Sequence, residues 1–258
     1  MKRITVIDFM RGLVMLVMAI DHLRDLTHIS ALTTSPTDLS TTTPSLFMTR
    51  WITHLCAPIF VFLSGASVFL SLNNQRDIPD FKRFLLSRGI WLILLELTVI
   101  SLGIWFDILF RFLMLQVIFA IGAGFILLSF LLKLRPNTLG IMGLVIIFGH
   151  NLLQGIVFEK AFVLNFIWAL LFNPNFFAVS SQFNVLINYP IVPWFGIMLL
   201  GYACGQLFLL PVEKRTKYLW QIGGIFLLLF MVIRFANGYG DPSKWTSQST
   251  FLFIAFIY

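Results

Sequence analysis

Seven stretches of this chain are apolar over about 20 residues, the length that an α-helix needs to cross a lipid bilayer. They are residues 6–27, 54–72, 88–106, 112–132, 138–158, 191–210 and 218–236. An eighth apolar stretch begins near Thr250 and stops at Tyr258, so we expect the chain to be the front part of a longer protein. Only 11% of the residues are charged, against about 25% in an ordinary soluble domain. The sequence therefore predicts an all-α, polytopic integral membrane helical bundle, a single transmembrane domain over residues 1–258 with seven full helices and a truncated eighth.

Most basic residues lie in short clusters between the apolar stretches, in every second connection. Because cytoplasmic loops of membrane proteins are enriched in Lys and Arg, this pattern places the N-terminus in the cytoplasm. The clusters account for the formal net charge of +7, so the expected surroundings are the lipid bilayer and not nucleic acid. They contain Lys2 and Arg3; Arg76, Lys82, Arg83 and Arg88; Lys133 and Arg135; and Lys214, Arg215 and Lys217.

Motifs for metals and phosphates are not visible in the sequence. The two cysteines, Cys56 and Cys204, both lie inside apolar stretches, and no zinc-type spacing of Cys and His occurs. A Gly-rich phosphate loop is not found either. We therefore expect no metal.

Two connections on the outer side are long. Residues 29–50 are rich in Ser, Thr and Pro, which is typical of a solvated loop able to fold over a site. Residues 159–190 are aromatic and rich in Asn without a clean spanning run. For this second connection we expect helices lying at the membrane interface or a lid packed on the bundle.

Five ionisable groups lie close together at the outer end of the first apolar stretch, in "MAIDHLRDLTH" (residues 18–28). Such groups are costly within a membrane unless they are paired or hydrated, and they normally face a cavity or the bundle interior. His22 follows Asp21 directly and lies one turn before Asp25, so a carboxylate is available to orient its ring, as a general base requires. We therefore predict that His22 is the base, with Asp21 or Asp25 orienting it. The alternative for Arg24 is a hydrated side chain at the outer membrane interface, and the alternative for Asp8 is an ion pair with Arg11 at the inner one.

Other polar residues interrupt the apolar stretches. Arg11 precedes His22 by eleven residues, a rise of about 16 Å along a helix, and so belongs to the cytoplasmic side. His54 is either an interfacial helix cap or part of the site, and His150 either binds a substrate hydroxyl or joins two helices. We expect Glu96 to be a structural partner of Arg11 or of another polar group rather than a catalyst. The same two roles, structural or catalytic, are open for Gln116.

A resemblance to a known family becomes visible in these segments. The pattern "DFMRGLVMLVMAIDH" resembles the first helix of the transmembrane acyltransferase superfamily, in which Asp-x-x-Arg is followed by an apolar run and a catalytic histidine. Further segments, including "RWITHLCAPIFVFLSGAS", "FGHNLLQGI" and "VPWFGIMLLGYACGQLF", resemble bacterial membrane proteins with a heparan-α-glucosaminide N-acetyltransferase catalytic domain. Together these segments cover most of the chain.

The resemblance implies a multi-pass protein of the bacterial inner membrane that moves an acyl group from cytoplasmic acyl-CoA, such as acetyl-CoA, to a sugar or glycan on the far side. The active histidine of the lysosomal enzyme lies in the first outer loop, so the choice of base among His22, His28 and His54 stays open. An acyl-histidine intermediate is a variant of the mechanism.

Under this hypothesis Arg11 holds the phosphate side of CoA. Arg24 and His54 contact the acceptor or the developing oxyanion, and His28 and His150 are further candidates for substrate binding. The rival hypothesis is a transporter or glycan-export protein that uses the same residues as a proton or substrate path. A membrane scaffold without catalysis is a third interpretation.

Overall fold

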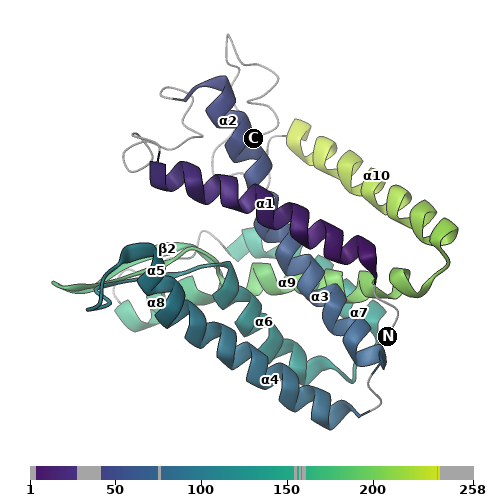
Figure 1. Ribbon diagram of the computed structural model, residues 1–258, viewed down its shortest axis with the longest axis horizontal. Coiled ribbons are helices and arrows are strands. Elements are labelled where there is room, and N and C mark those ends of the chain that lie inside the picture. Colours follow the sequence, from purple (N-terminus) through teal and green to yellow (C-terminus); the bar gives the residue numbers. More distant parts are fainter. Residues whose placement is uncertain are drawn as a thin grey trace. The chain divides into compact units, whose positions relative to one another are not determined.

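The computed structural model describes residues 4–27, 42–74, 77–153, 156, 158, 161–236 and 238. It divides into two compact units, residues 1–206 and 207–258, which are described separately. Figure 1 shows the helices and strands, coloured along the sequence from the N-terminus to the C-terminus. Of the predicted site residues, His28 lies outside the described part, as does the stretch after Thr250.

The first unit consists mainly of helices. They are α1 (Thr5–Thr27), α2 (Pro44–Thr53), α3 (Cys56–Asn74), α4 (Ile78–Leu95), α5 (Ser101–Trp105), α6 (Val117–Leu131), α7 (Pro136–Gly149), α8 (Phe162–Leu171) and α9 (Ile191–Cys204). A π-helical turn, η1 (Glu96–Ile100), joins α4 to α5. Two 3-10 turns, η2 (His150–Leu153) and η3 (Gly205–Leu209), follow α7 and α9. The second unit contains α10 (Val212–Ala236).

Five helical segments of the described chain are long and apolar enough to cross a membrane. They are Pro44–Asn74, Ile78–Trp105, Pro136–Leu153, Ile191–Leu209 and Val212–Ala236. These confirm a polytopic membrane helical protein and correspond to five of the seven predicted stretches. The remaining two predicted stretches differ from these five. Residues 6–27 form α1, a helix that contains more charged residues, and residues 112–132 contain α6, which has only 15 residues.

The chain is mostly helical, as predicted, but the expected all-α fold is incomplete, because three strands form a small sheet. Its strands β1 (Phe112–Leu115), β2 (Asn175–Ser180) and β3 (Phe183–Ile187) lie in the order β1-β3-β2. β1 runs parallel to β3, and β2 pairs with β3 as an antiparallel hairpin. The predicted helix over residues 112–132 therefore begins as a strand, and the connection over residues 159–190 contributes a hairpin besides the helix α8.

The inner face of the sheet packs on neighbouring helices. Leu115, Phe177, Val185 and Ile187 form a buried cluster with a residue from each of α6 and α8. Burial of these side chains holds the sheet against the first turns of α6. The loops at the carboxyl ends of β1 and β3 are thereby fixed relative to that helix.

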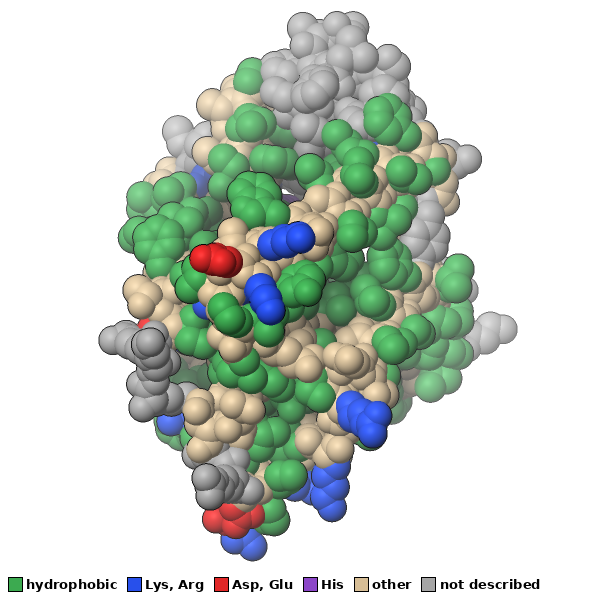
Figure 2. Space-filling model, turned by 90° about the vertical axis from the view of Figure 1, so that its right-hand side faces the viewer, with side chains coloured by type: hydrophobic (Ala, Val, Ile, Leu, Met, Phe, Trp, Pro, Cys, Tyr) green, Lys and Arg blue, Asp and Glu red, His purple; other side chains and the backbone are tan. Residues whose placement is uncertain are grey.

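Small residues bring the long helices into close contact. A Cβ atom added at Gly65 of α3 would overlap the backbone carbonyl of Met198 in α9, and one added at Gly201 of α9 would overlap that of Phe62. Membrane helices pack closely through such small residues because lipid supplies no hydrophobic force between them. The outward faces are apolar, as Phe9 and Leu16 of α1 are more than 60% exposed. Figure 2 shows a face on which hydrophobic side chains predominate and charged side chains are few.

Candidate active site

A cavity of about 240 Å³ lies where the end of α1 meets α2, the start of α3, the start of α6 and the loop between β3 and α9. Two histidines and several polar side chains face it. The lining residues are Met18, Asp21, His22, Arg50, Thr53, His54, Cys56, Ala57, Gln116, Val117, Asn188, Tyr189 and Trp194.

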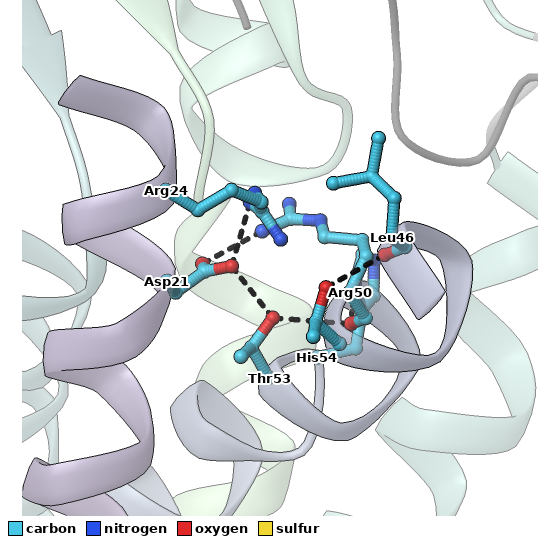
Figure 3. A network of polar contacts seen from close by, with 7 residues as sticks. Asp21, Arg24, Leu46, Arg50, Thr53 and His54 are labelled. Atoms are coloured by element: carbon cyan, nitrogen blue, oxygen red, sulfur yellow. Dashed lines mark hydrogen bonds and ion pairs between the residues drawn. The ribbon is translucent and has the colours of Figure 1, made fainter. Parts of the chain in front are cut away.

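Asp21 is the centre of a polar network at this cavity (Figure 3). Its Oδ1 lies 2.7 Å from Arg24 Nη2 and accepts a hydrogen bond of 2.6 Å from the Thr53 hydroxyl. Its Oδ2 accepts a hydrogen bond of 2.8 Å from Arg50 Nη1. Asp21 therefore binds one arginine of its own helix and one of α2. Because charge-assisted hydrogen bonds are the stronger kind, this network fixes α2 against α1.

The local sequence explains how α2 presents its side chains. Thr43 caps the helix by accepting the Leu46 backbone N–H, and Pro44 occupies the first turn, where a missing N–H is tolerated. Arg50, Thr53 and His54 are spaced by three and four residues and so share one face. This face turns toward the end of α1.

Two histidines line the cavity from different elements. His22 comes from α1, and His54 follows α2. The Nδ1 atom of His54 lies 3.2 Å from the backbone carbonyl oxygen of Arg50. A carbonyl oxygen only accepts, so Nδ1 carries the proton in this contact and the neutral ring has its lone pair on Nε2.

The structure brings together three of the predicted site residues, Asp21, His22 and His54, around one cavity. Arg24 joins them through its ion pair with Asp21. The hydrogen bonds of Asp21 go to arginines and a threonine, and none to His22 is found among the described residues. Asp25 belongs to α1, but its side chain lies outside the described part of the structure.

The other two predicted residues lie elsewhere. Arg11 of α1 donates a hydrogen bond to Ser67 of α3 and lies 3.7 Å from Asp8. Its partner is therefore not Glu96. His150 begins η2, and its Nδ1 lies 2.8 Å from the carbonyl oxygen of Ile147. Neither Arg11 nor His150 is a lining residue of the cavity.

Glu96 has a structural partner at the start of α6. Its side chain is 1% exposed, and Oε1 accepts the backbone N–H of Gln116 at 3.0 Å. A carboxylate at this position favours a helix N-terminus electrostatically. Gln116, in turn, is a lining residue of the cavity, and its side-chain amide donates to the Met114 sulfur at 2.7 Å.

Sequence reasoning missed several lining residues. For Arg50 the sequence offers one indication: it lies four residues before His54 in the segment "RWITH", a spacing that places both side chains on one face of a helix. Asn188 and Tyr189 follow an unpredicted strand and carried no signal. Burial raises the pKa of the Tyr189 phenol above its usual value, so this side chain is a neutral hydroxyl donor over the physiological range.

A metal centre has no candidate among the described residues, since no three His, Cys, Asp or Glu side chains of that part lie close enough together to hold an ion. The side chains around the cavity can instead accept a proton, donate hydrogen bonds and stabilise negative charge. These are the capacities that acid–base chemistry requires.

The fold and the cavity define a polytopic membrane helical protein with a polar, histidine-containing site. Residues 3–234 match the model of a family described as heparan-alpha-glucosaminide N-acetyltransferase, catalytic, and the chain belongs to this family. The resemblance seen in the sequence is thereby confirmed. No curated protein and no solved structure shows significant similarity to the chain.

Proposed function

We propose that this chain is a membrane acyltransferase that moves an acetyl or other short acyl group from acyl-CoA to a hydroxyl or amine of a sugar or glycan. The observation that carries the proposal is the meeting of His22, His54 and Arg50 at one cavity, in a chain of an acetyltransferase family. The clustering of Lys and Arg in alternate connections supports a site on the extracytoplasmic side.

His22 acts as the general base. Its imidazole takes the proton of the acceptor O–H or N–H while the acceptor atom forms a bond to the acyl carbon. The carbon–sulfur bond of the thioester then breaks, and the CoA thiolate leaves and receives the proton. Positioned bases of this kind contribute about 10²- to 10⁴-fold to a rate.

Arg50 stabilises the negative charge that develops on the acyl oxygen. Its guanidinium lines the cavity and is held by Asp21 at 2.8 Å, so it is oriented before the reaction begins. Preorganised cationic donors are worth most where charge develops in the transition state. Asp21 is in this account a positioning residue for Arg50, and His54 is a second histidine in contact with the acceptor.

The size of the cavity limits what it holds. At about 240 Å³ it falls below the range of roughly 300–1,000 Å³ for pockets of drug-sized ligands. It accommodates the acyl end of the donor and the reacting part of the acceptor, so the rest of CoA lies outside it. Arg11, about 16 Å along α1 from His22, is our candidate for the phosphate side of CoA.

The test is release of CoA thiol from acetyl-CoA by the purified chain in lipid nanodiscs, with a panel of sugars and amino sugars. We expect acceptor-dependent release that falls at least about 100-fold in His22→Ala. Arg50→Gln should lose a comparable amount, whereas the matched variant Arg111→Gln, whose side chain is 59% exposed, should not. Release at the wild-type rate from folded His22→Ala would overturn the role of His22 and direct the search to His54 and His28.

A further inference from the structure

The loop between α5 and β1 exposes three large apolar side chains. Phe106, Ile108 and Leu109 are 82%, 81% and 74% exposed. Proteins rarely present such side chains to water next to one another, and a cluster of them is typical of a site that contacts a membrane or another protein. We call residues 106–110 the apolar finger.

The apolar finger is held in one conformation by its own backbone contacts. Phe106 and Phe110 have positive φ angles of 50° and 49°, a region that residues with a Cβ atom rarely adopt unless their surroundings hold them there. Asp107 supplies these contacts. Its Oδ1 accepts the backbone N–H of Leu109 at 3.1 Å, and its Oδ2 accepts that of Arg111 at 3.0 Å. The carboxylate thus fastens the loop while its apolar neighbours stay exposed.

The length of the preceding helical segment places the finger at a membrane surface. The segment is the candidate span Ile78–Trp105, and Arg88 is its last basic residue. Arg88 is exposed, and an exposed arginine on a membrane helix extends to the headgroups. From Arg88 to Trp105 a helix rises about 26 Å, close to the thickness of about 30 Å of the hydrocarbon core. Trp105 therefore lies near the opposite interface, where tryptophan is enriched.

The surface between these two levels is continuous with the finger. Its exposed side chains are apolar and include Ile90, Leu94, Val99 and Leu102. A lipid-facing surface of this kind is expected along a membrane span. Because the finger follows Trp105 directly, the same lipids that cover the span are in position to cover the finger.

We infer that the apolar finger inserts into the outer leaflet of the bilayer, with Phe106, Ile108 and Leu109 among the upper parts of the lipid chains. The inference goes beyond acyl transfer and does not depend on it. Lipid removes the three side chains from water, which is the favourable term. The ion pair of Asp107 with Arg111, 3.0 Å between Oδ2 and Nε, stays at the level of the headgroups.

The finger also holds the small sheet at a set height relative to the lipid. β1 begins at Phe112 and ends at Leu115, directly before the cavity residue Gln116. Figure 1 shows α5 beside the sheet. The ring of Phe112 packs on that of Trp105, with 4.5 Å between their centroids. The cavity is therefore tied to the membrane surface through β1.

The test measures how deeply the finger lies in lipid. The full chain with Cys56→Ala and Cys204→Ala receives one new cysteine, Leu109→Cys, which is labelled with the environment-sensitive fluorophore NBD in phosphatidylcholine nanodiscs. Lipids with a nitroxide group quench NBD on contact, and the nitroxide is placed either near the headgroup or near the end of the chain. We expect emission at shorter wavelength than in water, and stronger quenching by the nitroxide near the headgroup.

Two labelled controls define the scale. Gln182→Cys, exposed in the turn between β2 and β3, should emit as in water and escape quenching. Val99→Cys, 62% exposed and about 16 Å along the helix from Arg88, should be quenched most by the nitroxide near the chain end. Thermal unfolding shows that each labelled variant is folded.

Two results would overturn the inference. A Leu109 probe that behaves like the Gln182 probe would show that the finger lies in water. A Leu109 probe that emits at short wavelength without quenching by either lipid would show that protein covers the finger, as in contact with a second copy of the chain. Neither result bears on acyl transfer, which is measured separately by release of CoA.

Discussion

Replacing Asp21 by Asn removes a negative charge that contacts two arginines, Arg24 and Arg50. The side chains of Asp21 and Arg24 are 15% and 10% exposed, and their atoms lie 2.7 Å apart, so this pair is largely buried. Removing one partner of a buried ion pair costs about 3–5 kcal/mol. Arg50 is 32% exposed, so its pair adds at most about 1 kcal/mol. Because Asn still accepts from Thr53, we expect Asp21→Asn to lower the free energy of unfolding by about 3 kcal/mol.

The assay is unfolding by SDS titration in mixed micelles, read by tryptophan fluorescence. Adding Arg24→Met to Asp21→Asn removes the cation left behind and should restore about half of the loss. Asp80→Asn is the matched control, since Asp80 lies 3.9 Å from Arg83 and both side chains are more than 70% exposed; it should change stability by no more than about 0.5 kcal/mol. Equal, small losses in Asp21→Asn and Asp80→Asn would refute the reasoning.

Three further predictions concern the folded chain. Hydrogen bonds from the Arg111 side chain and nearby backbone lower the pKa of Asp107 in the folded chain. The Asp107 carboxylate therefore stabilises the fold above about pH 4, the pKa of an aspartate in the unfolded chain. This stabilisation is lost as the pH falls through the lower pKa of the folded chain. Asp107→Asn should therefore reduce the melting temperature at neutral pH and lose that effect in acid, and a pH series that shows the same difference throughout would contradict this. Gly65→Ala should lower the free energy of unfolding by about 3 kcal/mol, because the added methyl group overpacks α3 against α9. Gly12→Ala is the control: nothing lies within 4 Å of the added atom, so the same SDS titration should show no loss or a slight gain. Equal effects of the two substitutions would be evidence against the close packing. Glu96→Ala should destabilise the chain by about 1–2 kcal/mol by leaving an N–H of α6 without its acceptor, more than Glu96→Gln, which keeps one.

Much of the helical architecture was predictable because an apolar run of membrane-spanning length has few alternatives. The sheet was not. β1 is four residues long and merges with the apolar stretch of α6, and a short apolar strand cannot be told from a buried helix by periodicity. Its partner residues lie about 70 positions later, as in the pair Phe112 and Asn184. No local pattern in the sequence reports a register over that distance.

The candidate site was predictable in part for a related reason. Ionisable residues in an apolar stretch are conspicuous, and this contrast alone indicates Asp21, His22 and His54. The hydrogen bond between Arg50 and Asp21 joins residues 29 positions apart, so the local sequence could suggest His22 as the neighbour of Asp21 and could not reveal the arginine. Tyr189 depends on the position of β3 and was invisible for the same reason.

The most direct test of the central claim follows the acyl group itself. Acetyl-CoA with an isotopically labelled acetyl group is incubated with the purified chain and a sugar acceptor, and the acceptor is analysed by mass spectrometry. The account predicts one labelled acetyl group per acceptor molecule in the wild type and its loss in His22→Ala. An unlabelled acceptor, together with acceptor-driven proton flux in liposomes containing the protein, would contradict acyl transfer and support the transporter hypothesis.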